Sequence, residues 1–86
     1  MQIAVYDTYV KRRDGRVMHF DVIVPADCSP QEAIQYGQQY LADKPVFDQT
    51  LTSQQCRFCH TQPASPQWSQ AITDQGYFIY EMEGCD

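Results

Sequence analysis

Cysteine and histidine side chains gather in one short run of this chain, Cys56-Arg57-Phe58-Cys59-His60. Two cysteines separated by two residues can bind a soft metal ion, close a short disulfide loop or carry out thiol redox chemistry. When histidine follows directly, the same spacing is the attachment sequence of a covalent haem. These chemistries need different partners and compartments, so other features of the sequence are needed to discriminate among them.

Zinc binding is one interpretation of this run. Structural zinc takes four thiolate or imidazole ligands in a tetrahedral arrangement. Cys56 and Cys59 form a close pair, and Cys85 with His60 or His19 could complete the set. A strong zinc signature has two close pairs, and neighbouring side chains such as Cys59 and His60 diverge along an extended backbone. Zinc therefore stays an alternative, and its candidate ligands are Cys56, Cys59, His60 and Cys85.

Redox chemistry, haem attachment and simple packing are the other interpretations. A reactive C-x-x-C pair normally begins a helix, but the helix expected here begins only near Ser65. Haem would use His60 with Met82 or Met18 and requires export, yet the N-terminus reaches a charge at Asp7, too early for a secretory signal. Packing is favoured, because buried free cysteine behaves as a small hydrophobic residue. We predict no haem and no firm cofactor.

Length and charge exclude several functional classes. The 86 residues predict a single globular domain over residues 1–86. A net charge of −5 argues against nucleic-acid binding, which requires clustered lysine and arginine. No segment has the length of a membrane span, so we expect no membrane association. Without a visible export signal, the cytoplasm is the expected location, and the four cysteines should be reduced there.

Two strands are predicted at the N-terminus. Residues 2–10 and 16–24 are rich in β-branched and aromatic side chains. Between them, Asp14-Gly15 is a preferred two-residue hairpin loop. This loop would place Thr8 opposite Asp21 and so fix which side chains share a face.

The same register predicts one apolar face, covered by helices, and one open face. The apolar face would contain Asp7, a carboxylate that would need a partner there. The open face would contain His19 and Asp21, whose spacing could also support acid–base chemistry. Exposed tyrosines beside them would suit a protein partner or a planar ligand. The predicted binding surface consists of Tyr6, His19, Asp21, Tyr77 and Tyr80.

Two helices follow from their capping signals. Ser29 followed by proline, with Glu32 three residues later, predicts a helix start with a capping box, and that helix should run to about Asp43. Ser65 followed by proline predicts a second start, and Gly76 is a natural stop.

The remaining strands complete the fold. A third strand is expected near residues 54–59 and a last strand over residues 77–83. The order is then β-β-α-β-α-β. We predict an α+β fold in which a mixed four-stranded sheet carries two helices on one face.

Four runs resemble a small bacterial family known only as a domain of unknown function. They are VYDTYV (5–10), VMHFDV (17–22), CRFCH (56–60) and GYFIYEMEGC (76–85). The resemblance spans nearly the whole chain and implies a compact α+β domain of this size. It implies no established activity, substrate or catalytic residue.

A binding or interaction module, rather than an enzyme, is the function that the sequence predicts. No phosphate-binding glycine loop, nucleophile elbow or catalytic carboxylate motif is present in the sequence. The partner would be a protein or a small molecule, and an exposed sheet edge could pair two copies. The alternative function is a metal-binding or thiol-redox protein centred on CRFCH.

Overall fold

The computed structural model describes residues 1–44 and 50–85. Its elements are β1 (Gln2–Lys11), β2 (Val17–Pro25), α1 (Pro30–Ala42), β3 (Cys56–Pro63), α2 (Pro66–Gln75) and β4 (Phe78–Glu83). The predicted α+β fold and its β-β-α-β-α-β order are confirmed. The third strand begins and ends later in the chain than the predicted residues 54–59.

Local sequence signals account for both helix starts. The Oγ of Ser29 accepts a hydrogen bond from the Glu32 amide at 3.2 Å, and the Glu32 carboxylate accepts one from the Ser29 amide at 3.2 Å. At α2, the Oγ of Ser65 accepts from the Trp68 amide at 3.2 Å, and Gly76 ends the helix in the left-handed region at φ 96°. Each N-cap contributes about 1 kcal/mol of stability. Neither helix of the described residues is long and apolar enough to cross a membrane.

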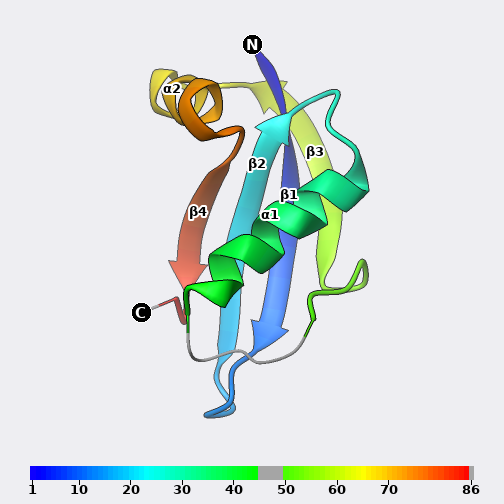
Figure 1. Ribbon diagram of the computed structural model, residues 1–86, viewed down its shortest axis with the longest axis vertical. Helices are drawn as coiled ribbons and strands as arrows, with labels where there is room; N and C mark the ends of the chain where they lie inside the picture. Colours follow the sequence, from blue (N-terminus) through cyan, green and yellow to red (C-terminus); the bar gives the residue numbers. More distant parts are fainter. Residues whose placement is uncertain (45–49, 86) are drawn as a thin grey trace.

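The sheet has the strand order β3-β1-β2-β4 and is antiparallel at every pairing (Figure 1). The mixed sheet predicted from the sequence is therefore corrected. After β2 the chain passes through α1 to the far side of β1, and after α2 it returns to the outer side of β2. Each new strand lies beside an inner strand that runs in the opposite direction, so all three pairings are antiparallel.

The turn between β1 and β2 is one residue longer than predicted. The Arg12 amide donates to the Arg16 carbonyl at 2.8 Å, and the Gly15 amide donates to the Arg12 carbonyl at 3.0 Å. Gly15 has a φ of 90°, which only glycine adopts readily. This is a three-residue hairpin loop in which a glycine forms a bulge.

The longer turn shifts the strand register by one residue. Thr8 lies opposite Phe20, and Asp7 lies opposite Asp21, whereas the sequence analysis placed Thr8 there. Because side chains alternate along a strand, a slip of one residue moves every side chain of β1 to the other face. Tyr6 therefore enters the core at 4 % exposure, and Asp7 leaves it.

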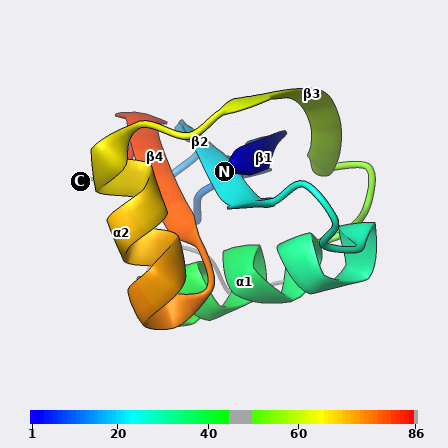
Figure 2. The same ribbon diagram turned by 90° about the horizontal axis from the view of Figure 1, so that it is seen from above.

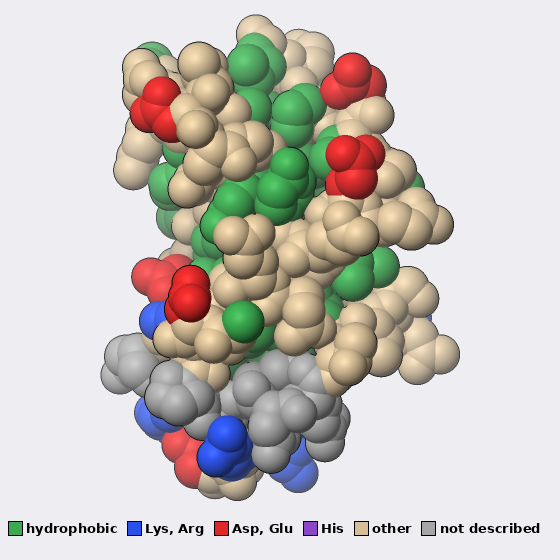
Figure 3. All heavy atoms as spheres, in the orientation of Figure 1, with side chains coloured by type: hydrophobic (Ala, Val, Ile, Leu, Met, Phe, Trp, Pro, Cys, Tyr) green, Lys and Arg blue, Asp and Glu red, His purple; other side chains and the backbone are tan. Residues whose placement is uncertain are grey.

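Helix α1 covers one face of the sheet (Figures 1 and 2). Its buried residues Ala33 and Leu41 pack against even-numbered side chains of the two inner strands. Those side chains are Ala4, Tyr6, Val10, Met18, Phe20, Val22 and Val24. Figure 3, which views this side, shows hydrophobic side chains gathered between the two helices and no histidine on the near surface.

Helix α2 lies beside β4, at the edge of the sheet (Figure 2), and its buried side chains do not pack on the face that α1 covers. Its Ile72 and Trp68 pack with Ile3, Val5 and Ile23. The side chains of these three strand residues alternate with those that face α1, so they point to the opposite side. This differs from the predicted arrangement, in which both helices lay on one face. The predicted register had assembled the apolar residues on a single face, and the true register divides them between two.

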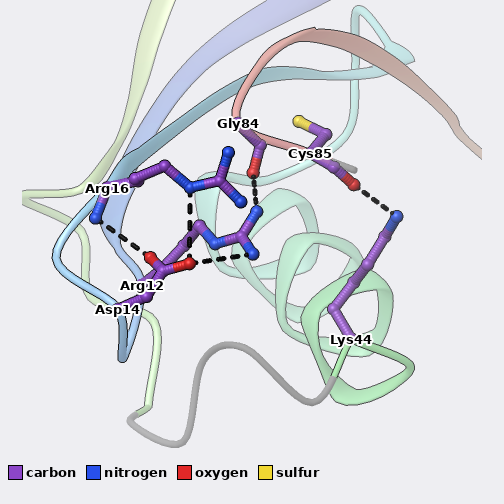
Figure 4. Close-up of polar contacts among 6 residues, drawn as sticks. All are labelled: Arg12, Asp14, Arg16, Lys44, Gly84 and Cys85. Carbon is purple, nitrogen blue, oxygen red and sulfur yellow. Dashed lines mark hydrogen bonds and ion pairs between the residues drawn. The ribbon is translucent and has the colours of Figure 1, made fainter.

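The hairpin turn is tied to the C-terminal segment (Figure 4). The guanidinium of Arg12, only 6 % exposed, donates to the Gly84 carbonyl at 2.8 Å and lies 3.2 Å from the Asp14 carboxylate. From the segment just after α1, the Lys44 ammonium donates to the Cys85 carbonyl at 2.7 Å. These contacts join the turn, the end of α1 and the segment after β4.

Replacing the buried arginine should loosen this junction. We expect Arg12→Ala to lower the free energy of unfolding by about 1–3 kcal/mol, because it leaves the partly buried Gly84 carbonyl without its charged donor. The melting temperature should fall by about 4–8 °C for each kcal/mol. Arg16→Ala is the matched control, since Arg16 meets the same Asp14 at 3.3 Å but is 56 % exposed. Equal losses for the two variants would contradict this account.

Candidate functional site

A polar area remains uncovered on the face opposite α1. Helix α2 covers the apolar end of that face, and the other end carries the polar residues of β1 and β2. Tyr80 of β4 lies opposite Asp21 and adds a ring that is 49 % exposed. We define the open face as Asp7, Tyr9, His19, Asp21 and Tyr80.

Two carboxylates lie directly opposite each other on the open face. Asp7 and Asp21 are cross-strand partners, and Asp21 is 9 % exposed. Its Oδ1 is buried without a hydrogen-bond partner. Burial, then the hydrogen bond and the negative charge of Asp7, raise the pKa of Asp21 to about 7. Accepting that hydrogen bond lowers the pKa of Asp7, so Asp7 holds the charge and Asp21 holds the proton.

An imidazole completes the cluster. The ring of His19 is stacked on Tyr9, with centroids 3.9 Å apart and planes inclined by 12°. Its Nε2 lies 3.7 Å from Oδ1 of Asp7 and is buried without a hydrogen-bond partner. One ligand atom each from Asp7, His19 and Asp21 lies within 4.8 Å of the others. Carboxylate oxygens and a fixed imidazole nitrogen at this spacing can share a proton or hold a cation.

A groove of about 460 Å³ opens beside the cluster. Asp7 and Tyr9 belong to both the groove and the open face, whereas the opposite wall comes from β3 and the residues before it. The groove is lined by Asp7, Tyr9, Gln54, Gln55, Arg57, Phe58 and Cys59. Asp7, whose side chain is 39 % exposed, therefore connects the buried carboxylate of Asp21 with the solvent.

The structure does not bring the predicted zinc ligands together. Cys56 and Cys85 are both buried in the core under α1, but they belong to opposite edges of the sheet. Three strand spacings of about 4.8 Å separate those edges, which is too far for one ion. The described residues form a metal-ligating group of three or more only at Asp7, His19 and Asp21.

Two residues of CRFCH do meet. Val5 pairs with His60 and Tyr6 pairs with Phe58, so Cys59 is the extra residue of a β-bulge. The bulge brings Cys59 into the groove, where its Sγ lies 3.3 Å from Nδ1 of His60. Loss of solvation and the charge of Asp7 raise the pKa of the Cys59 thiol. A raised pKa reduces the thiolate fraction on which redox chemistry depends.

The predicted binding surface is divided between the two faces. His19, Asp21 and Tyr80 lie on the open face as expected. Tyr6 is in the core, and Tyr77 is stacked on Tyr36 of α1 with centroids 4.5 Å apart. The sequence analysis missed two members, Asp7 and Tyr9. The predicted register buries the Asp7 carboxylate on the apolar face, which is energetically costly. That cost was a signal that the register was wrong, because a shift of one residue moves both Asp7 and Tyr9 to the open face.

Comparison with known proteins identifies a family and a solved structure that are similar to this chain. A family model described as a domain of unknown function, DUF2024, matches residues 1–82. The chain is also similar to the NMR structure of protein NE1680 from Nitrosomonas europaea, a Northeast Structural Genomics Consortium target. The identity is 49 %, all of both chains is covered, and the TM-score is 0.86. No curated protein matches this chain.

The carboxylate pair should make stability depend on pH. Folded Asp21 has a pKa of about 7, well above the value of about 3.9 for a free aspartate. The folded state therefore binds more protons between these values, and the free energy of unfolding should fall as the pH rises through them and level off above about 7. We expect a loss on the order of 2 kcal/mol, less than the full pKa shift would give, because solvent at the partly exposed pair screens the interaction. The lowered pKa of Asp7 adds a separate loss of stability only at lower pH, below the pKa of a free aspartate.

Urea unfolding at a series of pH values tests this dependence. Asp21→Asn should flatten the pH profile and be more stable than the unmodified protein above neutral pH. Asp27→Asn, at an exposed position, should leave the profile unchanged. A profile that stays the same in Asp21→Asn would refute the shared proton.

The four thiols should react at three different rates. Cys59 is exposed, Cys28 is half-buried, and Cys56 and Cys85 are 3 % and 8 % exposed. In metal-free folded protein, a thiol reagent such as DTNB should modify Cys59 first and Cys28 more slowly. The two buried thiols should react only on unfolding. Mass mapping of the modified peptides checks the order, and rapid modification of Cys56 or Cys85 in folded protein would contradict it.

Proposed function

This chain belongs to the DUF2024 family of domains of unknown function, and we propose that it is a small binding module that holds a cation on the open face of its sheet. The observation that carries this proposal is the Asp21 carboxylate, which is buried opposite a second carboxylate and has one oxygen without a partner. Buried polar groups are normally hydrogen-bonded, and buried charges are paired or coordinate an ion.

Without a bound cation, the carboxylate pair lowers the stability of the folded protein. Like charges directly opposite each other across a sheet are destabilising, and burial adds a desolvation penalty. Protonation of Asp21 relieves the repulsion but leaves its Oδ1 unsatisfied. A cation bound between Asp7 and Asp21 would relieve both costs, because it supplies positive charge to both carboxylates.

The surroundings of the pair favour a positively charged ligand. The chain carries a net charge of −5, which raises the local concentration of cations at its surface. The ring of Tyr9 is 52 % exposed beside the pair, and an aromatic face attracts cations. The groove beside Asp7 supplies a route from the solvent.

The compartment and the alternative site also belong to this proposal. We propose a reducing compartment such as the cytoplasm, because all four cysteines are free thiols. The alternative function, a metal or thiol site at CRFCH, is supported only by the contact between Cys59 and His60. We favour the open face, because it offers three ligating groups where the CRFCH contact offers two.

Titration of ¹⁵N-labelled protein with simple cations tests the proposal. The panel consists of methylammonium, guanidinium, magnesium, manganese and zinc chlorides, each added at a pH above the pKa of Asp21. We expect at least one cation to shift or broaden the amide signals of Asp7, His19 and Asp21, with saturation. Binding should weaken as the pH falls below about 7, because the proton on Asp21 competes with the cation.

Paired variants identify the site of binding. Asp21→Asn should abolish the saturable shifts on the open face, and Asp27→Asn should keep them. The absence of saturable shifts on the open face with every cation of the panel would refute the proposed function.

A further inference from the structure

We propose that the bound cation is a divalent transition-metal ion, such as zinc, ligated by Asp7, His19 and Asp21. This inference rests on the proposed function, because it names the ligand of the same open face. The juxtaposition that supports it is an imidazole nitrogen beside two carboxylates, with every pair of ligand atoms within 4.8 Å. No residue of CRFCH belongs to this set.

The chemistry of the donors selects the class of cation. Magnesium and calcium prefer oxygen ligands alone, whereas imidazole suits zinc, iron, copper and nickel. An imidazole with two carboxylates therefore favours a borderline transition metal. An organic ammonium would use the carboxylates but would leave the Nε2 lone pair of His19 without a role.

The spacing fits an ion after a small adjustment. Zinc bonds of about 2.0–2.2 Å place tetrahedral ligand atoms roughly 3.3–3.6 Å apart. His19 Nε2 and Asp7 Oδ1 are 3.7 Å apart, close to that range. Asp7 is the most exposed of the three ligands and can rotate to close the remaining distance. Tyr9 holds the imidazole by stacking, which orients the ligand as outer-shell contacts do in metal sites.

Two buried atoms without partners point to a ligand independently of the spacing. Oδ1 of Asp21, on a residue that is only 9 % exposed, has no hydrogen-bond partner. Nε2 of His19, which lies two residues before Asp21 on the same face of β2, also has no hydrogen-bond partner. One ion between them would satisfy both atoms.

Charged and titratable groups from every neighbouring strand face the site. On β3, Arg57 is the cross-strand partner of Asp7, and its positive charge disfavours a bound cation. The Cys59 thiol also lies near Asp7. On β4, Glu83 lies opposite His19 and favours a cation, while Tyr80 lies opposite Asp21. The two carboxylates of the cluster dominate this balance because they are the ligands themselves.

The site would leave a coordination position open. Zinc takes four ligands and the cluster supplies three. Of the three ligands Asp7 lines the groove of about 460 Å³, so water or a small molecule could reach a bound ion from that side. Such open positions are typical of metal sites that bind or activate a ligand.

Calorimetric titration of chelator-treated protein with zinc chloride tests the metal. We expect one ion per chain. His19→Gln and Asp21→Asn should each lower the affinity by at least about 100-fold, more than outer-shell changes usually do. The double variant Cys59→Ser, His60→Gln is the matched control and should bind zinc normally. Unfolding curves confirm that each variant is folded, and Asp21→Asn should be the most stable.

Cobalt absorption distinguishes the two sites by their ligands. A cobalt complex of the open face should lack a thiolate charge-transfer band, and its spectrum should survive in the Cys59→Ser, His60→Gln variant. A thiolate band, or zinc binding that is lost only in that variant, would overturn the inference in favour of CRFCH. Binding of methylammonium or guanidinium on the open face without metal binding would overturn the metal and leave the proposed function standing. No binding of any cation would refute both.

Discussion

The register of the first hairpin is the constraint on which the rest of this structure depends. The turn closes through the Arg12–Arg16 backbone hydrogen bond, with Gly15 in the left-handed region. Because β1 and β2 are the two inner strands, their register fixes which side chains face each layer of the molecule. The Arg12 guanidinium also donates to the Gly84 carbonyl, and this contact holds the same turn against the C-terminal segment.

The register divides the apolar side chains between two faces and leaves part of one face uncovered. Helix α1 buries the even-numbered residues of the inner strands, and α2 reaches only the end of the opposite face. The uncovered part carries Asp7, His19 and Asp21. A small domain has little apolar surface to spare, so a buried carboxylate that faces a second carboxylate is a substantial cost within a net stability of about 5–15 kcal/mol. Arrangements that cost stability in this way are frequently those that bind a ligand.

The two cysteine-containing segments illustrate how spacing along the chain can suggest a site that the fold does not assemble. Cys56 begins β3 and points into the core, while the bulge directs Cys59 to the other side. Cys85 follows β4 at the opposite edge of the sheet. The C-x-x-C spacing is compatible with a shared ion only if the backbone turns between the two thiols, and here that backbone is a strand.

The helices and the first two strands could be predicted from local residue patterns. Serine caps followed by proline mark both helix starts, and β-branched and aromatic runs mark the first two strands. The strand order, the hairpin register and the meeting of Asp7 with His19 and Asp21 depend on long-range packing and became visible in the folded chain. A single residue in the turn separates two registers with the same local preferences, and the choice between them depends on packing summed over the whole sheet. The spacing of His19 and Asp21 along one strand indicated two members of the candidate site, but Asp7 joins them only in the register that this packing selects.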